Sequence, residues 1–99
     1  AMPDPNEKAR LHIKVRGRVQ GVGFRVHVEH AARELNLTGW VRNVGYDHVE
    51  TVAEGVRGAL EQLAQAIQAG PLGSHVDEAT TEWLAATGEF NSFAVRRSV

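Results

Sequence analysis

The sequence contains no cysteine, which excludes disulfide bonds, thiolate catalysis and zinc ribbons. No apolar run approaches the roughly 18 residues of a membrane-spanning helix, and no signal-peptide core appears near the N-terminus. Charge of one sign is not in excess either: the formal net charge is −1, with acidic and basic residues interspersed. These absences predict a cytoplasmic protein that binds neither membranes nor nucleic acids.

The 99 residues are enough for one domain, and a hydrophobic content of 42% is ordinary for a folded globular chain. Residues 1–8 are polar and include two prolines, so we expect a flexible N-terminal tail. Residues 9–99 are expected to form the single folded domain.

The first half of the domain begins with a strand pattern. Leu11, Ile13 and Val15 alternate with polar residues, which predicts a half-buried strand. A turn-rich stretch follows at residues 17–23. Apolar residues then recur at helical spacing from Phe24 to Leu35, which predicts an amphipathic helix.

A stop signal and two further strand patterns follow this helix. Asn36 is expected to end the helix, because asparagine tolerates the left-handed backbone conformation better than most residues. Strands are predicted at residues 37–44 and 48–54, and the short segment 45–47 between them predicts a hairpin turn.

The second half of the domain also shows patterns typical of a helix and of strands. A helix is predicted at residues 56–69, ended by the Gly70-Pro71 pair. A loop is expected at 72–75, a strand at about 79–84, and a final strand through Phe93 and Val95. The order βαββαβ predicts an α+β fold: a ferredoxin-like sandwich in which an antiparallel sheet carries two helices on one face.

Residues 17–25 have the composition of an anion site. The stretch Gly17-Arg18-Val19-Gln20-Gly21-Val22-Gly23 joins a strand to a helix. Glycines allow successive amide N–H groups to face one concavity, and the first amides of a helix have no internal partner. Arg25, in the first helical turn, could reach the same place with its planar donors. From these residues alone, an ordinary turn with a solvent-exposed arginine remains the alternative.

Two motifs resemble the acylphosphatase family. Gly17 to Arg25 is similar to the family's glycine, Val-Gln-Gly-Val and aromatic-Arg signature, and Gly39-Trp40-Val41-Arg42-Asn43 is similar to its second signature. Gly70-Pro71 and the terminal segment from Gly88 also resemble the family. The resemblance covers nearly everything after residue 9, so it implies that residues 9–99 form an acylphosphatase-like domain.

The resemblance implies a reaction and a site. The substrate would be an acyl phosphate, cleaved to a carboxylate and inorganic phosphate by a monomeric hydrolase that needs no metal and no cofactor. Asn43 would orient the attacking water. Arg25 would bind the phosphate group together with the backbone amides of five loop residues, namely Gln20, Gly21, Val22, Gly23 and Phe24.

The hairpin turn departs from the family pattern, which usually has glycine where this chain has Asp47. Aspartate tolerates a positive φ only moderately well, so Gly45 is expected to take over the strained position. A reshaped turn with intact chemistry is the expected consequence.

The sequence also leaves two rival functions and one rival site open. The acylphosphatase-like N-terminal domain of a hydrogenase-maturation carbamoyltransferase resembles the same motif but usually has proline after the arginine, where Val26 stands here. A ferredoxin-like single-stranded RNA-binding module would need an aromatic-rich motif on the central strands and a more basic chain. A metal site at His27 and His30 lacks a third ligand at a suitable spacing, so both are expected to be surface residues.

Overall fold

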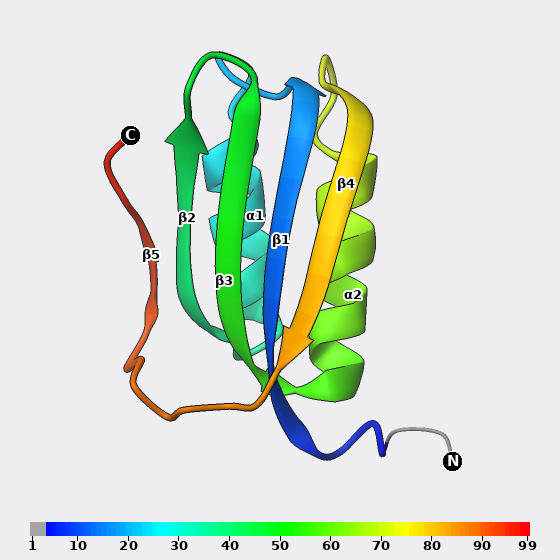
Figure 1. Ribbon diagram of the computed structural model, residues 1–99, viewed down its shortest axis with the longest axis vertical. Helices are drawn as coiled ribbons and strands as arrows, with labels where there is room; N and C mark the ends of the chain where they lie inside the picture. Colours follow the sequence, from blue (N-terminus) through cyan, green and yellow to red (C-terminus); the bar gives the residue numbers. More distant parts are fainter. Residues whose placement is uncertain (1–3) are drawn as a thin grey trace.

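The computed structural model describes residues 4–99, and residues 1–3 lie outside the described part of the chain. Both helices lie on one face of a single sheet (Figure 1), so the predicted ferredoxin-like sandwich is confirmed. The strand order is β4-β1-β3-β2-β5. The elements are β1 (Lys8–Arg18), α1 (Phe24–Glu34), β2 (Thr38–Val44), β3 (His48–Val56), α2 (Arg57–Ala69), β4 (His75–Leu84) and β5 (Phe93–Val95).

The sheet is antiparallel except at one edge. β1 pairs with β3 and β4, and β3 pairs with β2, all in antiparallel registers. β5 pairs with β2 in parallel, from Gly39↔Phe93 to Val41↔Val95. The chain crosses the end of the sheet after β4 and then runs back along β2 (Figure 1). The expected antiparallel sheet is therefore extended by one parallel edge strand.

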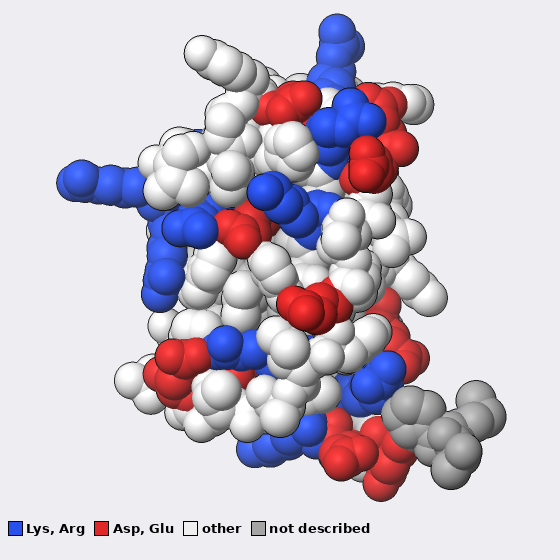
Figure 2. Space-filling model, viewed as in Figure 1, with Lys and Arg blue, Asp and Glu red and all other residues white. Residues whose placement is uncertain are grey.

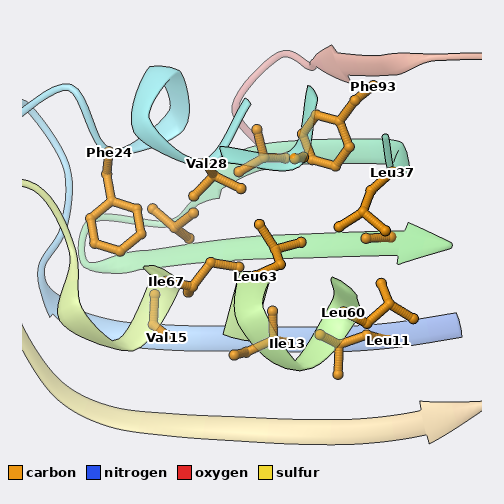
Figure 3. Packing of buried hydrophobic residues seen from close by; sticks show 14 of the residues in the cluster. Leu11, Ile13, Val15, Phe24, Val28, Leu37, Leu60, Leu63, Ile67 and Phe93 are labelled. Atoms are coloured by element: carbon orange, nitrogen blue, oxygen red, sulfur yellow. The ribbon is translucent and has the colours of Figure 1, made fainter. Parts of the chain in front are cut away.

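The core lies between the sheet and the two helices (Figure 3). Alternation along β1 directs Leu11, Ile13 and Val15 toward the helices, and all three are buried. α1 lies over β2 and β5, whereas α2 lies over β1 and β3. Val19 and Phe24, on either side of the glycine-rich turn, are both buried as well. The core therefore fixes both ends of that turn.

The predicted helix stops are confirmed. Asn36 has φ 57°, and its N–H donates to the carbonyl of Arg33 at 3.1 Å. The N–H of Leu37 donates to the carbonyl of Ala32 at 2.9 Å, which completes a Schellman motif. Gly70 follows α2 as its cap, with its N–H donating to Ala66 at 3.0 Å. Neither helix of the described chain has the length and apolar character needed to cross a bilayer.

β4 begins earlier than its sequence pattern indicates. The predicted strand starts at about residue 79, after a loop at 72–75, but the observed strand already includes His75. Most residues of β4 are exposed, because this edge strand pairs only with β1 and neither helix fully covers it. Without a buried face, its first residues show no apolar alternation, and the sequence pattern misses them.

Residues 4–8, which fall within the predicted tail, contact the start of α2. No side chain caps this helix. Instead, the N–H groups of Arg57 and Gly58 donate to the carbonyls of Glu7 and Pro5 at 2.8 and 2.9 Å. Lys8 is already part of β1. The N-terminal backbone thus takes the place of the usual side-chain cap.

A buried carboxylate fastens the segment that crosses to β5. Glu54 is 5% exposed. Its Oε2 accepts hydrogen bonds from Arg10 Nε at 2.7 Å, the Thr87 N–H at 3.0 Å and Thr87 Oγ1 at 2.9 Å, and its Oε1 accepts from the Gly88 N–H at 2.9 Å. Burial alone would raise the pKa of Glu54, but the hydrogen bonds from Thr87, Gly88 and Arg10 outweigh it and lower the pKa to about 2.

Stability should therefore fall on acidification through this group. Because the pKa of Glu54 is lower in the folded state than its ordinary 4.5, its contribution is complete above pH 4.5 and disappears as the pH falls toward 2. That contribution is on the order of 3 kcal/mol. Glu54→Gln should lower the free energy of unfolding at pH 7 by about this amount. It should also make the free energy of unfolding less dependent on pH between 4.5 and 2, as measured by urea denaturation.

Glu78→Gln is the matched control, because the side chain of Glu78 is 63% exposed and pairs with Arg16 at 3.3 Å on the surface. Its effect should stay within about 0.5 kcal/mol. If the free energy of unfolding of Glu54→Gln fell between pH 4.5 and 2 as steeply as that of the wild type, the acid dependence could not be assigned to Glu54.

Candidate active site

Two predicted site residues from different elements line one hollow. The β1–α1 turn and the β2–β3 hairpin lie at the same end of the sheet (Figure 1). A hollow of about 120 Å³ is present there. Arg25 comes from the first turn of α1 and Asn43 from the end of β2. The lining consists of Val19, Gly21, Gly23, Phe24, Arg25, Val26 and Asn43.

Two glycines shape the turn that borders this hollow. Gly21 and Gly23 both have φ 75°, in the left-handed region where a side chain is strained. Gly23 is also the N-cap of α1, with no side chain capping the helix. Left-handed residues within a turn direct successive N–H groups toward one side, which forms an anion-binding concavity.

The amides of this turn are available to a ligand. Among residues 4–99, no hydrogen bond is donated by the backbone N–H groups from Gln20 to Val26. The first paired amide is that of His27, which donates to the Gly23 carbonyl at 3.0 Å. The positive end of the α1 dipole adds to these donors. Donors of one polarity thus gather where α1 begins, as phosphate binding requires.

Arg25 adds a full positive charge. Its side chain has no ion-pair or hydrogen-bond partner in the described part of the chain, residues 4–99, and the residue is half-buried. Most other arginines there are neutralised by a carboxylate, namely Arg10, Arg16, Arg33, Arg42 and Arg57. An unpaired guanidinium beside unpaired amides favours an anion with several oxygen atoms.

Strand alternation places Asn43 on the helix side of the sheet. Val41 is fully buried against the helices, and residue 43 faces the same side, two positions along β2. The backbone of Asn43 is held from both edges: it is in register with Val49 of β3, and its carbonyl accepts a hydrogen bond from the Val99 N–H at 3.0 Å. Its carboxamide forms no hydrogen bond with any of residues 4–99, so it is available to a small molecule in the hollow.

The hairpin turn confirms the expectation for its glycine. Gly45 has φ 60°, whereas Asn36 is the only non-glycine residue within 4–99 with a positive φ, so Asp47 is not strained. The Asp47 carbonyl accepts a hydrogen bond from the Gly17 N–H at 2.9 Å, which ties the hairpin to the end of β1.

The sequence pattern misses one side chain at this end. The sequence predicts Gln20 only as a backbone donor, yet its side-chain Nε2 donates to carbonyls of the hairpin at Val44, Gly45 and His48. Contacts between segments so far apart along the chain leave no trace in local periodicity.

A second hollow, of about 570 Å³, lies at the opposite end of the sheet, with Lys8, Thr38, Glu54 and Phe90 in its lining. Although it is larger, its buried carboxylate already accepts hydrogen bonds from three residues. Its lining within residues 4–99 does not combine an unpaired arginine with unpaired helix-terminal amides, as the hollow around Arg25 does, so the smaller hollow is the better candidate for anion chemistry.

The remaining candidates from the sequence have partners within the chain. His27 Nε2 contacts the Ala66 carbonyl at 3.1 Å, and His30 pairs with Glu34 at 3.3 Å. No group of three or more potential metal-ligating His, Asp or Glu side chains occurs among the described residues.

The two tryptophans are covered by arginines. Guanidinium groups lie over the ring of Trp40, from Arg42 at 4.7 Å and Arg96 at 5.0 Å, and Arg57 lies 3.9 Å from the ring of Trp83. Acidic and basic side chains are interspersed over the outer face of the sheet (Figure 2). Neither feature resembles an open stacking platform for nucleic-acid bases.

Known proteins match this chain over most of its length. The acylphosphatase family model matches residues 11–95. An acylphosphatase of Salinibacter ruber is 43% identical over 88 residues, which cover 89% of this chain and 93% of the relative. The crystal structure of the Bacillus subtilis acylphosphatase is 34% identical with a TM-score of 0.85, covering 89% of this chain and 98% of that one.

A similar unit also occurs inside a larger protein. Full-length HypF, crystallised in a phosphate- and nucleotide-bound form, is 27% identical with a TM-score of 0.83, but the match covers 93% of this chain and only 12% of HypF. The family model, the curated relative and the bacterial enzyme structure agree with each other and with the motifs around Arg25 and Asn43. On these grounds, the chain belongs to the acylphosphatase family of hydrolases.

Proposed function

We propose that this chain hydrolyses acyl phosphates to a carboxylate and inorganic phosphate, with Arg25 and the amides of residues 20–24 holding the phosphoryl group and Asn43 orienting the attacking water. One observation carries this proposal. An unpaired guanidinium, unpaired amides and an unpaired carboxamide border the same hollow. The proposal extends to a monomeric enzyme of the cytoplasm, in keeping with a chain that has no cysteine.

The lining of the hollow suits a substrate with a good leaving group. No carboxylate, histidine or lysine is among its described lining residues, so none of them can protonate a departing oxygen. A carboxylate needs no such help, because its conjugate acid has a pKa of about 4. A phosphate monoester releases a far more basic alkoxide and should be a much poorer substrate.

The remaining groups match the demands of phosphoryl transfer. Its transition state is loose, and charge accumulates on the phosphoryl oxygens, so catalysis consists mainly of positioning and charge stabilisation. The amides and the guanidinium of Arg25 supply preorganised donors for this charge. The carboxamide of Asn43 can accept a hydrogen bond from water and so direct its lone pair toward phosphorus.

The reaction itself is tested with acetyl phosphate and benzoyl phosphate. We expect both to release inorganic phosphate at rates that a chelator does not change. Butyl phosphate, an alkyl phosphate monoester of similar size, should react at least about 10³-fold more slowly. Phosphate release would be followed by a colorimetric assay. Dependence on a divalent ion, or equal rates for the monoester, would contradict the proposal.

Removal of Arg25 should abolish substrate binding and turnover together. Arg25→Ala is expected to lower kcat/KM by about 10³-fold or more, because it deletes the only full charge among the described lining residues of the hollow. Arg25→Lys should recover only part of the loss, since lysine keeps the charge but lacks the planar pair of donors. Arg16→Ala, which removes an arginine paired with Glu78, serves as the control and should leave kcat/KM unchanged.

Removal of Asn43 should separate binding from turnover. Asn43→Ala is expected to lower kcat by about 10²–10³-fold while the inhibition constant for inorganic phosphate changes little, because the phosphate donors remain in place. Asn91→Ala, at an exposed loop position, is the control. A normal kcat for Asn43→Ala would remove this residue from the mechanism.

A further inference from the structure

The side chain of Gln20 links the phosphate-binding turn to the hairpin, in addition to the backbone hydrogen bond from Gly17 to Asp47 at the end of β1. Gln20 Nε2 lies 2.9 Å from the carbonyl oxygen of His48, 3.1 Å from that of Gly45 and 3.3 Å from that of Val44. These three carbonyls belong to the two ends of the β2–β3 hairpin and its turn. The contact thus joins the segment that carries the unpaired amides to the strand that ends just after Asn43.

The turn has little support of its own. Its amides from residue 20 onward make no hydrogen bond within residues 4–99, and it contains two left-handed glycines. The core holds its ends through buried Val19 and Phe24, and Val22 between them packs against the core while only partly buried. Of the side chains between these two anchors, only that of Gln20 forms a hydrogen bond to another described element. The Gln20 side chain therefore supplies the direct hydrogen bonds between residues 20–23 and the hairpin at the end of β2.

The same contact leaves Gln20 unable to bind phosphate with its side chain. Nε2 has two hydrogens, and three carbonyl oxygens within 3.3 Å compete for them. The remaining polar atom of the side chain, the carboxamide oxygen, is an acceptor and would repel a phosphate oxygen. A direct role in binding the anion is thus unfavourable for this side chain.

We infer that Gln20 is a positioning residue that sets the distance between the phosphate-binding amides and the Asn43 carboxamide, and so aligns the bound phosphoryl group with the attacking water. Val44 directly follows Asn43, and Gln20 directly precedes the glycine turn, so the hydrogen bonds connect the two halves of the site at its border. This inference rests on the proposed function, because it assigns Gln20 a role in that reaction.

Gln20→Met keeps the length of the side chain and removes its donors. We expect kcat for benzoyl phosphate to fall by about 10- to 100-fold, since a displacement of about 1 Å in a reacting group can cost that much. The inhibition constant for inorganic phosphate should stay within about threefold, because Arg25 and the amides still bind the anion. Gln65→Met, on the exposed face of α2, is the matched control and should leave both quantities unchanged.

A double-mutant cycle with Asn43→Ala tests whether Gln20 acts through Asn43. If it does, adding Gln20→Met to the Asn43→Ala variant should lower kcat by less than about threefold. The effects of the two substitutions would then be strongly non-additive. Effects that multiply in the double variant would overturn the inference. An inhibition constant for phosphate that rises in parallel with the loss of kcat would also overturn it, because Gln20 would then act in binding.

Thermal unfolding distinguishes positioning from a general loss of stability. A lowered Tm with an unchanged kcat at 20 °C below that Tm would assign Gln20 a purely structural role and overturn the inference. Should Gln20→Met fail to fold, Gln20→Asn, whose amide is one methylene too short to reach the hairpin, is measured in its place with the same expected results. Absence of acyl phosphate hydrolysis in the wild type would instead refute the proposed function itself.

Discussion

The proposed function depends on a group of hydrogen-bond donors at the start of α1 that no partner within residues 4–99 satisfies. The backbone N–H groups from Gln20 to Val26 and the guanidinium of Arg25 have no partner within residues 4–99, and the hollow beside them has no carboxylate among its described lining residues. Such donors repel one another and gain nothing from folding unless water or an anion satisfies them. They persist because buried Val19 and Phe24 hold the ends of the segment in the core. Packing elsewhere thus maintains an arrangement that is unfavourable by itself.

Polar groups are paired at one end of the sheet and largely unpaired at the site end. At one end, the carboxylate of Glu54 accepts hydrogen bonds from Arg10, Thr87 and Gly88, which stabilise the segment leading to β5. At the other end, the backbone amides near Arg25, its guanidinium and the carboxamide of Asn43 have no partner within residues 4–99. A saturated cluster contributes to stability, whereas an unsaturated one is ready to bind.

Much of this protein follows from local sequence. Period-two alternation predicts β1 and places Asn43 on the same face as buried Val41, and the helical spacing from Phe24 predicts α1. Asn36 ends that helix as expected from its tolerance of a positive φ. The family membership likewise rests on motifs readable in the chain. Local backbone preference and apolar periodicity act over a few residues, so a sequence alone displays them.

Other features arise only when distant segments meet. The parallel pairing of β5 with β2, the early start of exposed β4 and the capping of α2 by the N-terminal backbone have no local pattern. The same holds for Gln20, whose side chain finds its partners in a hairpin more than twenty residues away. The sequence by itself determined the elements that carry Arg25 and Asn43 and the face of the sheet on which Asn43 lies. Only the tertiary structure decided their separation, because distances across a fold depend on contacts between elements that periodicity does not encode.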